Sequence, residues 1–145
     1  MLAWCAALHA VRLLVADDGA AARDWERQLL VASAGELAVE VFAARGTASH
    51  LETEKNRSGA AILLFRSPDA ALAAVEAGAA IAELNLGGLH HAPGRERVLD
   101  YLYLSDADRQ SLRRLEALGV RLSARDLPSS RALPAADWLA GEGAA

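Results

Sequence analysis

The clearest strand in the sequence is Ala61-Ile62-Leu63-Leu64-Phe65, and Arg66-Ser67-Pro68 follows it directly. Five apolar residues in a row are typical of a strand that is buried on both faces, as in a parallel sheet. A serine followed by a proline is a standard helix start, because the serine hydroxyl caps the first turn and proline has no N–H to satisfy. Residues 61–68 therefore predict a strand–loop–helix unit, the repeating element of an α/β sheet.

The same alternation of apolar runs and helical segments continues on both sides of this stretch. We expect strands at residues 11–16, 37–42, 61–65, 81–86, 99–104 and 120–125 and helices at residues 20–33, 46–57, 68–78 and 106–118, with Trp4 and Trp25 in the core or between layers. The prediction is an α/β fold, an open three-layer domain with a mainly parallel sheet and helices on both faces. Residues 1–127 would form this domain, and residues 128–145, rich in Ser, Ala, Pro and Gly, a flexible tail.

Composition excludes several classes of protein. Lys and Arg number 15 against 19 Asp and Glu, and a net charge of −4 is wrong for a general nucleic-acid binder. A hydrophobic content of 53% excludes a disordered chain. The single cysteine, Cys5, excludes an internal disulfide and a multi-cysteine zinc site, so no metal is expected. No apolar run is long enough to span a membrane, and the first residues lack a signal-peptide pattern, which predicts a cytoplasmic protein.

A binding site is expected where the strands end. In open α/β sheets, ligands bind beyond the carboxyl ends of the strands. On that ground the residues expected to line the site are Asp17, Ser67, Asn85, Gly87 and Gly88. None of their loops is a complete phosphate motif, and plain turn or capping roles are the alternative.

Two histidines lie close to this expected site. His90 and His91 follow the Gly87-Gly88 loop, and imidazole suits phosphoryl or proton transfer because it titrates near neutral pH. No partnering carboxylate stands beside them in the sequence, and ordinary surface histidines are the alternative.

The order of these segments resembles one family, the IIB subunits of the mannose/fructose/sorbose class of the bacterial phosphoenolpyruvate-dependent sugar phosphotransferase system. The resemblance runs from about Trp4 to Asp126. Residues 11–18 look like the family's strand and acidic turn, and residues 61–68 like its Phe-x-Ser-Pro cap. The most specific part is Val75-Glu76-Ala77-Gly78 leading to residues 84–89, which is similar to a Val-Glu-x-Gly … Asn-Val-Gly-Gly-Met stretch of the family.

The resemblance implies a cytoplasmic phosphocarrier, a protein-phosphohistidine–sugar phosphotransferase. A histidine of the family takes a phosphoryl group from a phosphohistidine on the IIA subunit or domain. It then passes the group to the sugar entering through the membrane IIC and IID subunits. No cofactor and no metal is implied, and neither the sugar nor the oligomeric state can be predicted.

The chain departs from the family at its start. The family's acceptor histidine lies in an Asp-Asp-Arg-Leu-Ile-His-Gly loop after the first strand, shortly before the residue that matches Trp4, and Met1 stands only three residues before Trp4. The first strand, the acceptor histidine and the arginine of that loop have no counterpart here, so we expect the first strand of the family to be missing. Either the reading frame begins upstream, which the helix-like Met1-Leu2-Ala3-Trp4 favours, or the chain is a natural truncation.

Three hypotheses for function follow. The first is a phosphocarrier recorded in shortened form. The second is a degenerate, non-catalytic IIB-like interaction or regulatory module that still binds IIA. The third is a generic α/β domain that binds a small anion or nucleotide and shares only the architecture.

Overall fold

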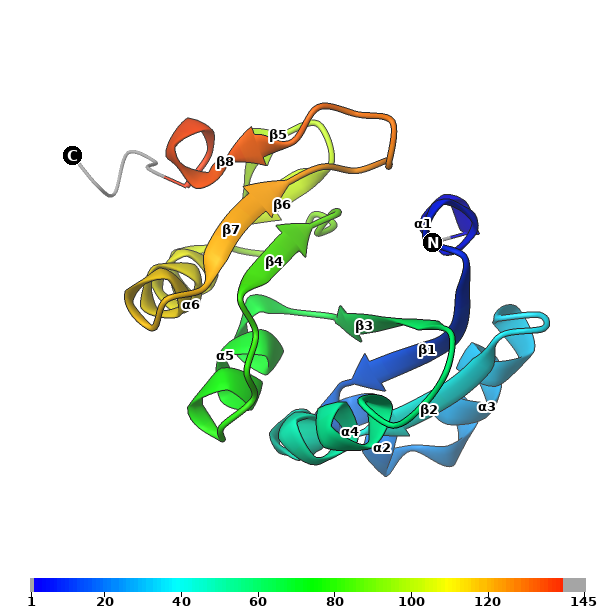
Figure 1. Ribbon diagram of the computed structural model, residues 1–145. Helices are drawn as coiled ribbons and strands as arrows, with labels where there is room; N and C mark the ends of the chain where they lie inside the picture. The colour runs from blue at the N-terminus through cyan, green and yellow to red at the C-terminus, as the bar shows by residue number, and fades with distance from the viewer. Residues whose placement is uncertain (1, 140–145) are drawn as a thin grey trace. The chain divides into compact units, whose positions relative to one another are not determined.

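The computed structural model describes residues 2–139, which divide into two compact units (Figure 1). Unit 1 comprises residues up to Arg66 together with Ala73–Ala80, and unit 2 comprises Ser67–Leu72 together with the residues from Ile81 onward. Helix α5 (Pro68–Glu76) is therefore shared between the two units. No helix within residues 2–139 has both the length and the apolar character needed to cross a membrane.

Unit 1 is built on a three-stranded parallel sheet with the order β2-β1-β3. Its elements are α1 (Leu2–Leu8), β1 (Ala10–Ala16), α2 (Asp18–Ala22), α3 (Asp24–Ser33), β2 (Ala38–Phe42), η1 (Ala44–Gly46), α4 (Thr47–Glu54) and β3 (Ala60–Phe65). The predicted parallel strands and the helices between them are confirmed here. The predicted helix over residues 20–33 is interrupted at Arg23, whose backbone is extended, with φ −117° and ψ 111°.

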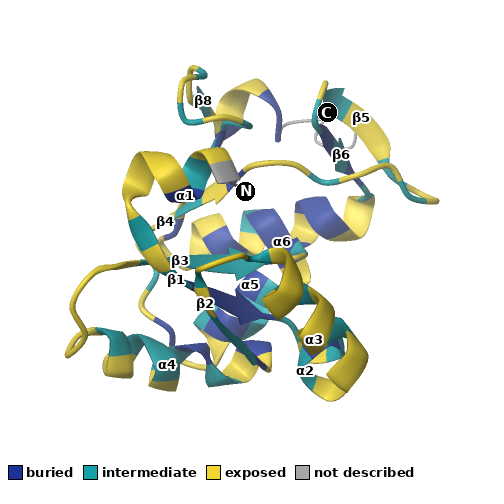
Figure 2. Ribbon diagram, turned by 90° about the vertical axis from the view of Figure 1, so that its right-hand side faces the viewer, coloured by how far each residue is buried: buried dark blue, intermediate teal, exposed yellow. Residues whose placement is uncertain are grey.

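The two faces of this sheet are covered by different helices. Leu14, Ala16 and Phe42 form a buried cluster on one face. On the same face Arg12 reaches across to Glu54 on α4. Figure 2 shows α4 on this side of the strands and α2 with α3 on the other, as right-handed crossovers require.

The outer edge of β3 is unpaired within the described residues. β1 pairs on both sides, with β2 and with β3, whereas β3 pairs with β1 alone. Between Ala60 and Phe65 the strand has no charged residue and no proline, two of the devices that usually protect an edge. Its residues have the composition of an interior parallel strand, but they are only half-buried.

Unit 2 contains a mixed sheet and a separate hairpin. Its elements are β4 (Glu83–Leu86), β5 (Glu96–Leu99), β6 (Leu102–Leu104), α6 (Asp106–Ala117), β7 (Arg121–Ala124), β8 (Leu133–Pro134) and η2 (Ala135–Asp137). β4 and β7 are parallel, β8 runs antiparallel to β7, and β5 pairs antiparallel with β6. Ser105 begins α6 with a reciprocal capping box, in which its side chain accepts from the Asp108 N–H and Asp108 accepts from the Ser105 N–H.

Three details correct the sequence interpretation. Residues 99–104 are not one strand of the parallel sheet, because Asp100 and Tyr101 form the turn of the β5–β6 hairpin. Trp25 is not a core residue, since 64% of it is exposed. Residues 133–139 do not form a tail: β8 pairs with β7, and Trp138 is buried, with its indole N–H donating to the Leu133 carbonyl at 3.0 Å. Residues 140–145 of the predicted tail lie outside the described residues.

Candidate functional site

The carboxyl ends of β1 and β3 bring Asp17 and Arg66 together in unit 1. Ala16 and Phe65 are register partners in the parallel pair, so the residues that follow them are neighbours. A guanidinium nitrogen of Arg66, Nη1, lies 3.5 Å from the Asp17 carboxylate oxygen Oδ2. The same oxygen accepts from the Ala20 N–H at 3.0 Å and so caps α2. The structure therefore places Asp17 at the carboxyl edge of the unit 1 sheet and fixes its side chain there.

Glu26 on α3 completes this group of side chains. Its two carboxylate oxygens accept from Arg23 Nη1 at 2.7 Å and from Arg66 Nη1 at 2.9 Å. The hydrogen bonds from Arg23 and then Arg66 hold the pKa of Glu26 below its ordinary value. The Glu26 side chain is 13% exposed, whereas those of Arg23 and Arg66 are 57% and 49% exposed. The result is a fixed carboxylate that orients two guanidinium groups open to solvent.

Sequence reasoning missed the roles of Arg23 and Glu26, and it treated Arg66 only as a loop residue. Arg66 and Glu26 are 40 residues apart, and charged residues on a helix usually form a solvated face. The one available signal was the position of Arg66 directly after the clearest strand.

Two predicted residues, Ser67 and Asn85, make hydrogen bonds to the backbone of unit 2. The Ser67 hydroxyl oxygen accepts from the Ala70 N–H at 3.2 Å in the first turn of α5, as the Ser-Pro start predicts. Asn85 lies on β4, and its amide nitrogen donates to the Arg125 carbonyl at 3.0 Å on the neighbouring strand end. Both side chains therefore stabilise loops at the ends of strands.

Gly87 and Gly88 follow β4 directly. Gly88 has φ +156°, and a Cβ built there would lie 3.2 Å from the Tyr101 carbonyl oxygen. The backbone therefore passes too close to its neighbour for a larger residue to fit without movement. Of the five predicted site residues, Asp17 lies in unit 1 and the other four in unit 2, and the lining of one phosphoryl site by all five stays a prediction.

The loop that carries His90 and His91 is held against the start of α6. Arg95 donates from Nε to Asp108 Oδ2 at 2.9 Å and from Nη1 to the His90 carbonyl at 3.1 Å. The His91 ring meets Tyr103 edge-on, with ring centroids 5.6 Å apart. Both histidines are exposed, and neither lies in an ion pair with a carboxylate in the described structure, consistent with surface histidines.

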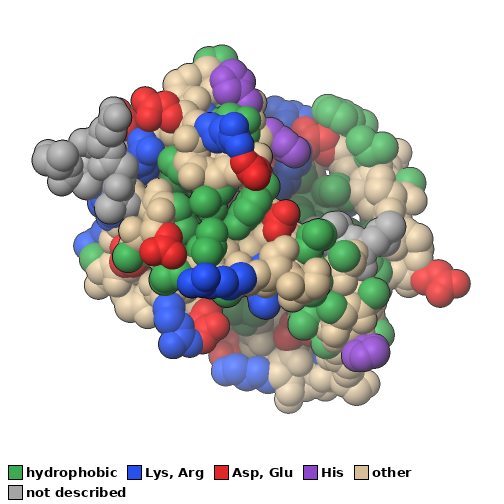
Figure 3. All heavy atoms as spheres, turned by 90° about the horizontal axis from the view of Figure 1, so that it is seen from above, with side chains coloured by type: hydrophobic (Ala, Val, Ile, Leu, Met, Phe, Trp, Pro, Cys, Tyr) green, Lys and Arg blue, Asp and Glu red, His purple; other side chains and the backbone are tan. Residues whose placement is uncertain are grey.

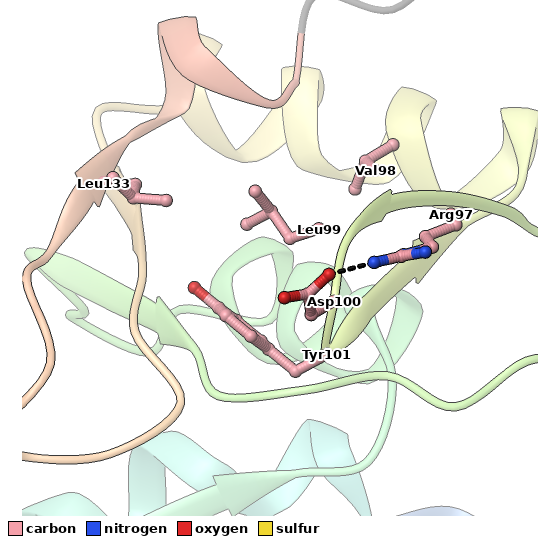
Figure 4. Close-up of a pocket in the computed structure, with 6 residues that line it drawn as sticks. All are labelled: Arg97, Val98, Leu99, Asp100, Tyr101 and Leu133. Carbon is pink, nitrogen blue, oxygen red and sulfur yellow. Dashed lines mark hydrogen bonds and ion pairs between the residues drawn. The ribbon is translucent and has the colours of Figure 1, made fainter.

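A hollow of about 550 Å³ lies where the β5–β6 turn meets β8 (Figure 4). Its lining residues are Arg97, Val98, Leu99, Asp100, Tyr101 and Leu133. In Figure 3, hydrophobic side chains gather on the face that carries β5 and β8, with charged side chains beside them. Burial, followed by the negative charge of Asp126, raises the pKa of Tyr101. The lining contains no histidine, cysteine or serine that could serve as a nucleophile.

Among residues 2–139, no three His, Cys, Asp or Glu side chains stand close enough together to hold a metal ion. In open α/β sheets ligands bind beyond the carboxyl ends of the strands, and Asp17 and Arg66 lie at that edge of the unit 1 sheet.

Comparison with known proteins identifies the family. The family model described as "PTS system sorbose subfamily IIB component" matches residues 1–144. The sorbose-specific EIIB component of Klebsiella pneumoniae is 28% identical over 127 residues, covering 87% of this chain and 77% of that protein. The fructose-specific EIIB component of Bacillus subtilis is 24% identical over 127 residues, with 87% and 78% covered.

Solved structures of phosphotransferase-system IIB components have the same fold as this chain. The IIBSor domain of the sorbose permease from Klebsiella pneumoniae superposes with a TM-score of 0.82 at 26% identity, covering 94% of this chain and 84% of that one. The N-acetylgalactosamine-specific IIB component 1 of Escherichia coli shares the fold, with a TM-score of 0.80 at 24% identity over 91% and 87% of the two chains.

The chain belongs to the sorbose subfamily of phosphotransferase-system IIB components. It is a phosphocarrier component of a sugar phosphotransferase system, with a phosphotransferase role of the general kind that the family performs. Membership implies interaction with IIA and with membrane IIC and IID components in general. The predicted family and α/β fold class are confirmed, and the alternative of a non-catalytic module is not favoured.

Proposed function

We infer that this protein, in the cytoplasm, takes a phosphoryl group from a phosphohistidine on a IIA subunit and passes it to a sugar entering through IIC and IID. In the first step an imidazole nitrogen of the acceptor attacks phosphorus as the donor P–N bond breaks. In the second step a sugar hydroxyl oxygen attacks phosphorus, the acceptor P–N bond breaks, and the hydroxyl proton goes to the imidazole nitrogen that leaves. The observation that carries this proposal is the match of residues 1–144 to the family.

The acceptor is proposed to be the histidine of the family's Asp-Asp-Arg-Leu-Ile-His-Gly loop, which has no counterpart among the four histidines of this sequence. His9 follows Trp4, whereas the family acceptor precedes that position. Activity is therefore proposed to need the loop and the strand before it in addition to these 145 residues. The open edge of β3 supports this requirement, since an all-apolar strand there is suited to a further parallel partner.

The phosphoryl group is proposed to lie over Asp17, Ser67, Asn85, Gly87 and Gly88. Their positions at the carboxyl ends of β1, β3 and β4 support this, because backbone N–H groups at such ends suit the charge of a phosphoryl group.

Phosphotransfer from phosphoenolpyruvate tests the proposed function. Two proteins are compared, the 145-residue chain and a version extended at its N-terminus by the family's first strand and loop. Each is incubated with labelled phosphoenolpyruvate, the general carrier proteins and a cognate IIA. We expect label on a histidine of the extended protein alone, and no label once the loop histidine is replaced by glutamine.

Two results would contradict the proposal. A well-folded extended protein that takes no label would exclude the phosphocarrier function. Label on the 145-residue chain that disappears in His90→Gln or His91→Gln would place the acceptor on residues already present and overturn the assignment to the loop.

A further inference from the structure

Helix α3 carries an apolar face that nothing covers in the described structure. Trp25 and Leu29 are 64% and 60% exposed, and Val31 is 49% exposed. Trp25 and Leu29 are four residues apart, so they lie one above the other on the same helix face. Figure 2 shows α3 exposed along almost its whole length, and none of its residues is buried. Tryptophan is enriched among the residues that anchor protein–protein interfaces, and a contiguous exposed apolar face is typical of an interaction site.

The opposite side of α3 is fixed to the carboxyl edge of unit 1. Glu26, the neighbour of Trp25, accepts from Arg66 at 2.9 Å, and Arg66 follows β3 directly. Arg27 donates to the Ala21 carbonyl at 2.7 Å, which ties α3 to α2. The helix is thus held in place before any partner arrives, so binding would not have to order it.

Three arginines and three carboxylates surround the Trp25–Leu29 face, and the guanidinium groups are most of its exposed charges. Arg23, Arg27 and Arg66 are exposed, while Glu26 is largely buried between two of them. Asp24 is the exposed carboxylate of the same helix. A partner that complements this surface has an apolar depression for the tryptophan and carboxylates at its rim.

We propose that the Trp25–Leu29 face is a docking site for the protein that donates the phosphoryl group to this chain. The proposal rests on the proposed function. Transfer between two proteins requires the reacting nitrogen and phosphorus to approach within about 3–3.5 Å. The donor must therefore cover the carboxyl edge of the strands, and α3 stands at that edge through the Glu26–Arg66 contact. Trp25 is the central anchor of the docked surface, and Leu29 extends it.

Binding of purified, unphosphorylated IIA, measured by isothermal titration calorimetry, tests the proposal without requiring phosphotransfer. We expect Trp25→Ala to weaken binding at least tenfold and Leu29→Ala to weaken it about threefold, as for anchors at the centre of an interface. Leu127→Ala, an apolar residue in unit 2 that is 48% exposed, is the matched control and should change affinity less than twofold. All three side chains are exposed, so thermal melting of the variants should match the unaltered protein.

Phosphotransfer by the extended protein separates docking from chemistry. Trp25→Ala should raise KM for phosphorylated IIA and leave kcat unchanged. If Trp25→Ala and Leu29→Ala both bind IIA as tightly as the unaltered protein, the docking proposal is overturned. Label uptake by the extended protein would then leave the proposed function standing. Sedimentation in which Trp25→Ala turns a dimer into a monomer would assign the face to a second copy of this chain. An unaltered protein that neither binds IIA nor takes label would overturn both proposals.

Discussion

Replacing Arg12 with methionine is expected to destabilise the protein by about 3 kcal/mol. Arg12 joins β1 to α4 and to the turn before β3. It donates from Nε and Nη2 to the Glu54 carboxylate at 2.9 and 2.8 Å, and to the carbonyls of Ser58 and Gly59 at 2.9 and 3.0 Å. The two side chains are only 12% and 15% exposed, so this is a partly buried pair and not a surface one.

The magnitude follows from what remains after the change. Removing one partner of a buried ion pair costs about 3–5 kcal/mol, because the other charge stays buried. Glu54 keeps one hydrogen bond, from Arg57 at 3.0 Å, which moves the expectation to the lower end of that range. An unfolding entropy of about 2.1 cal/mol/K per residue converts 3 kcal/mol into a fall in Tm of about 10 °C for a chain of this length.

Urea unfolding at pH 7 and at pH 3.5 is the assay. The hydrogen bond from Arg12, with a smaller one from Arg57, lowers the pKa of Glu54 against the opposing effect of burial. Stability that comes from a lowered carboxyl pKa is fully present when the pH is above the ordinary pKa, 4.5. It is lost as the pH falls through the lowered pKa. The unaltered protein should therefore lose more stability on acidification than Arg12→Met does.

Arg121→Met is the control, because Arg121 pairs with Glu83 at a site where both side chains are mostly exposed. It should change stability by less than about 0.5 kcal/mol. The reasoning would be refuted by an Arg12→Met protein that unfolds within 1 °C of the unaltered one, or by equal losses of stability in Arg12→Met and Arg121→Met.

Three smaller predictions concern single side chains. Ser105→Ala removes the α6 cap and should cost about 1–2 kcal/mol in urea unfolding, and a Ser105→Thr protein should recover most of it. Arg109→Met should be neutral or stabilising, because Arg109 is 6% exposed, its Nε has no hydrogen-bond partner among residues 2–139, and its ion-pair partner Asp106 is 90% exposed; a loss above about 2 kcal/mol would contradict this. Gly59→Ala should cost about 1–3 kcal/mol in thermal melting, since φ is +82° and the new Cβ would lie 2.7 Å from Val11; an unchanged Tm would show that the turn relaxes.

Local sequence patterns predicted the parallel strands and the helix starts well. The run 61–65 is apolar on both faces, and β3 occupies Ala60–Phe65. Ser67 followed by Pro68 predicts a helix start, and α5 begins at Pro68 with the Ser67 hydroxyl oxygen accepting from the Ala70 N–H. These features depend on residues within four positions of one another, so the sequence alone contains the necessary information.

The errors lie where distant contacts decide the structure. Residues 99–104 lack a glycine or proline to mark a turn, and Asp100-Tyr101 becomes one because Glu96 and Arg97 pair with strand β6. Residues 128–139 look like a tail by composition, yet β8 adds to the edge of β7 through Leu133 and Pro134. Local propensity cannot report such pairings.

The sequence predicted where the candidate site lies, but not which side chains form ion pairs and hydrogen bonds there. Asp17 was placed from the end of its strand, and the structure finds it at that edge. The pairing of Glu26 with Arg23 and Arg66 depends on the register of β1 and β3 and on the break in the helix at Arg23. Trp25 was expected inside because tryptophan is usually well buried, but no residue of α3 is buried and Trp25 is exposed.

Because Trp138 is buried in unit 2, its fluorescence can be used to follow the unfolding of that unit. Trp138 is 4% exposed and donates to the Leu133 carbonyl, whereas Trp25 in unit 1 already meets water in the folded protein. On unfolding, the emission of Trp138 should move to longer wavelength, while that of Trp25 hardly changes. In a Trp4→Phe background, fluorescence therefore follows the opening of unit 2, and circular dichroism follows both units. Noncoincident transitions by the two methods would mean that the units unfold separately.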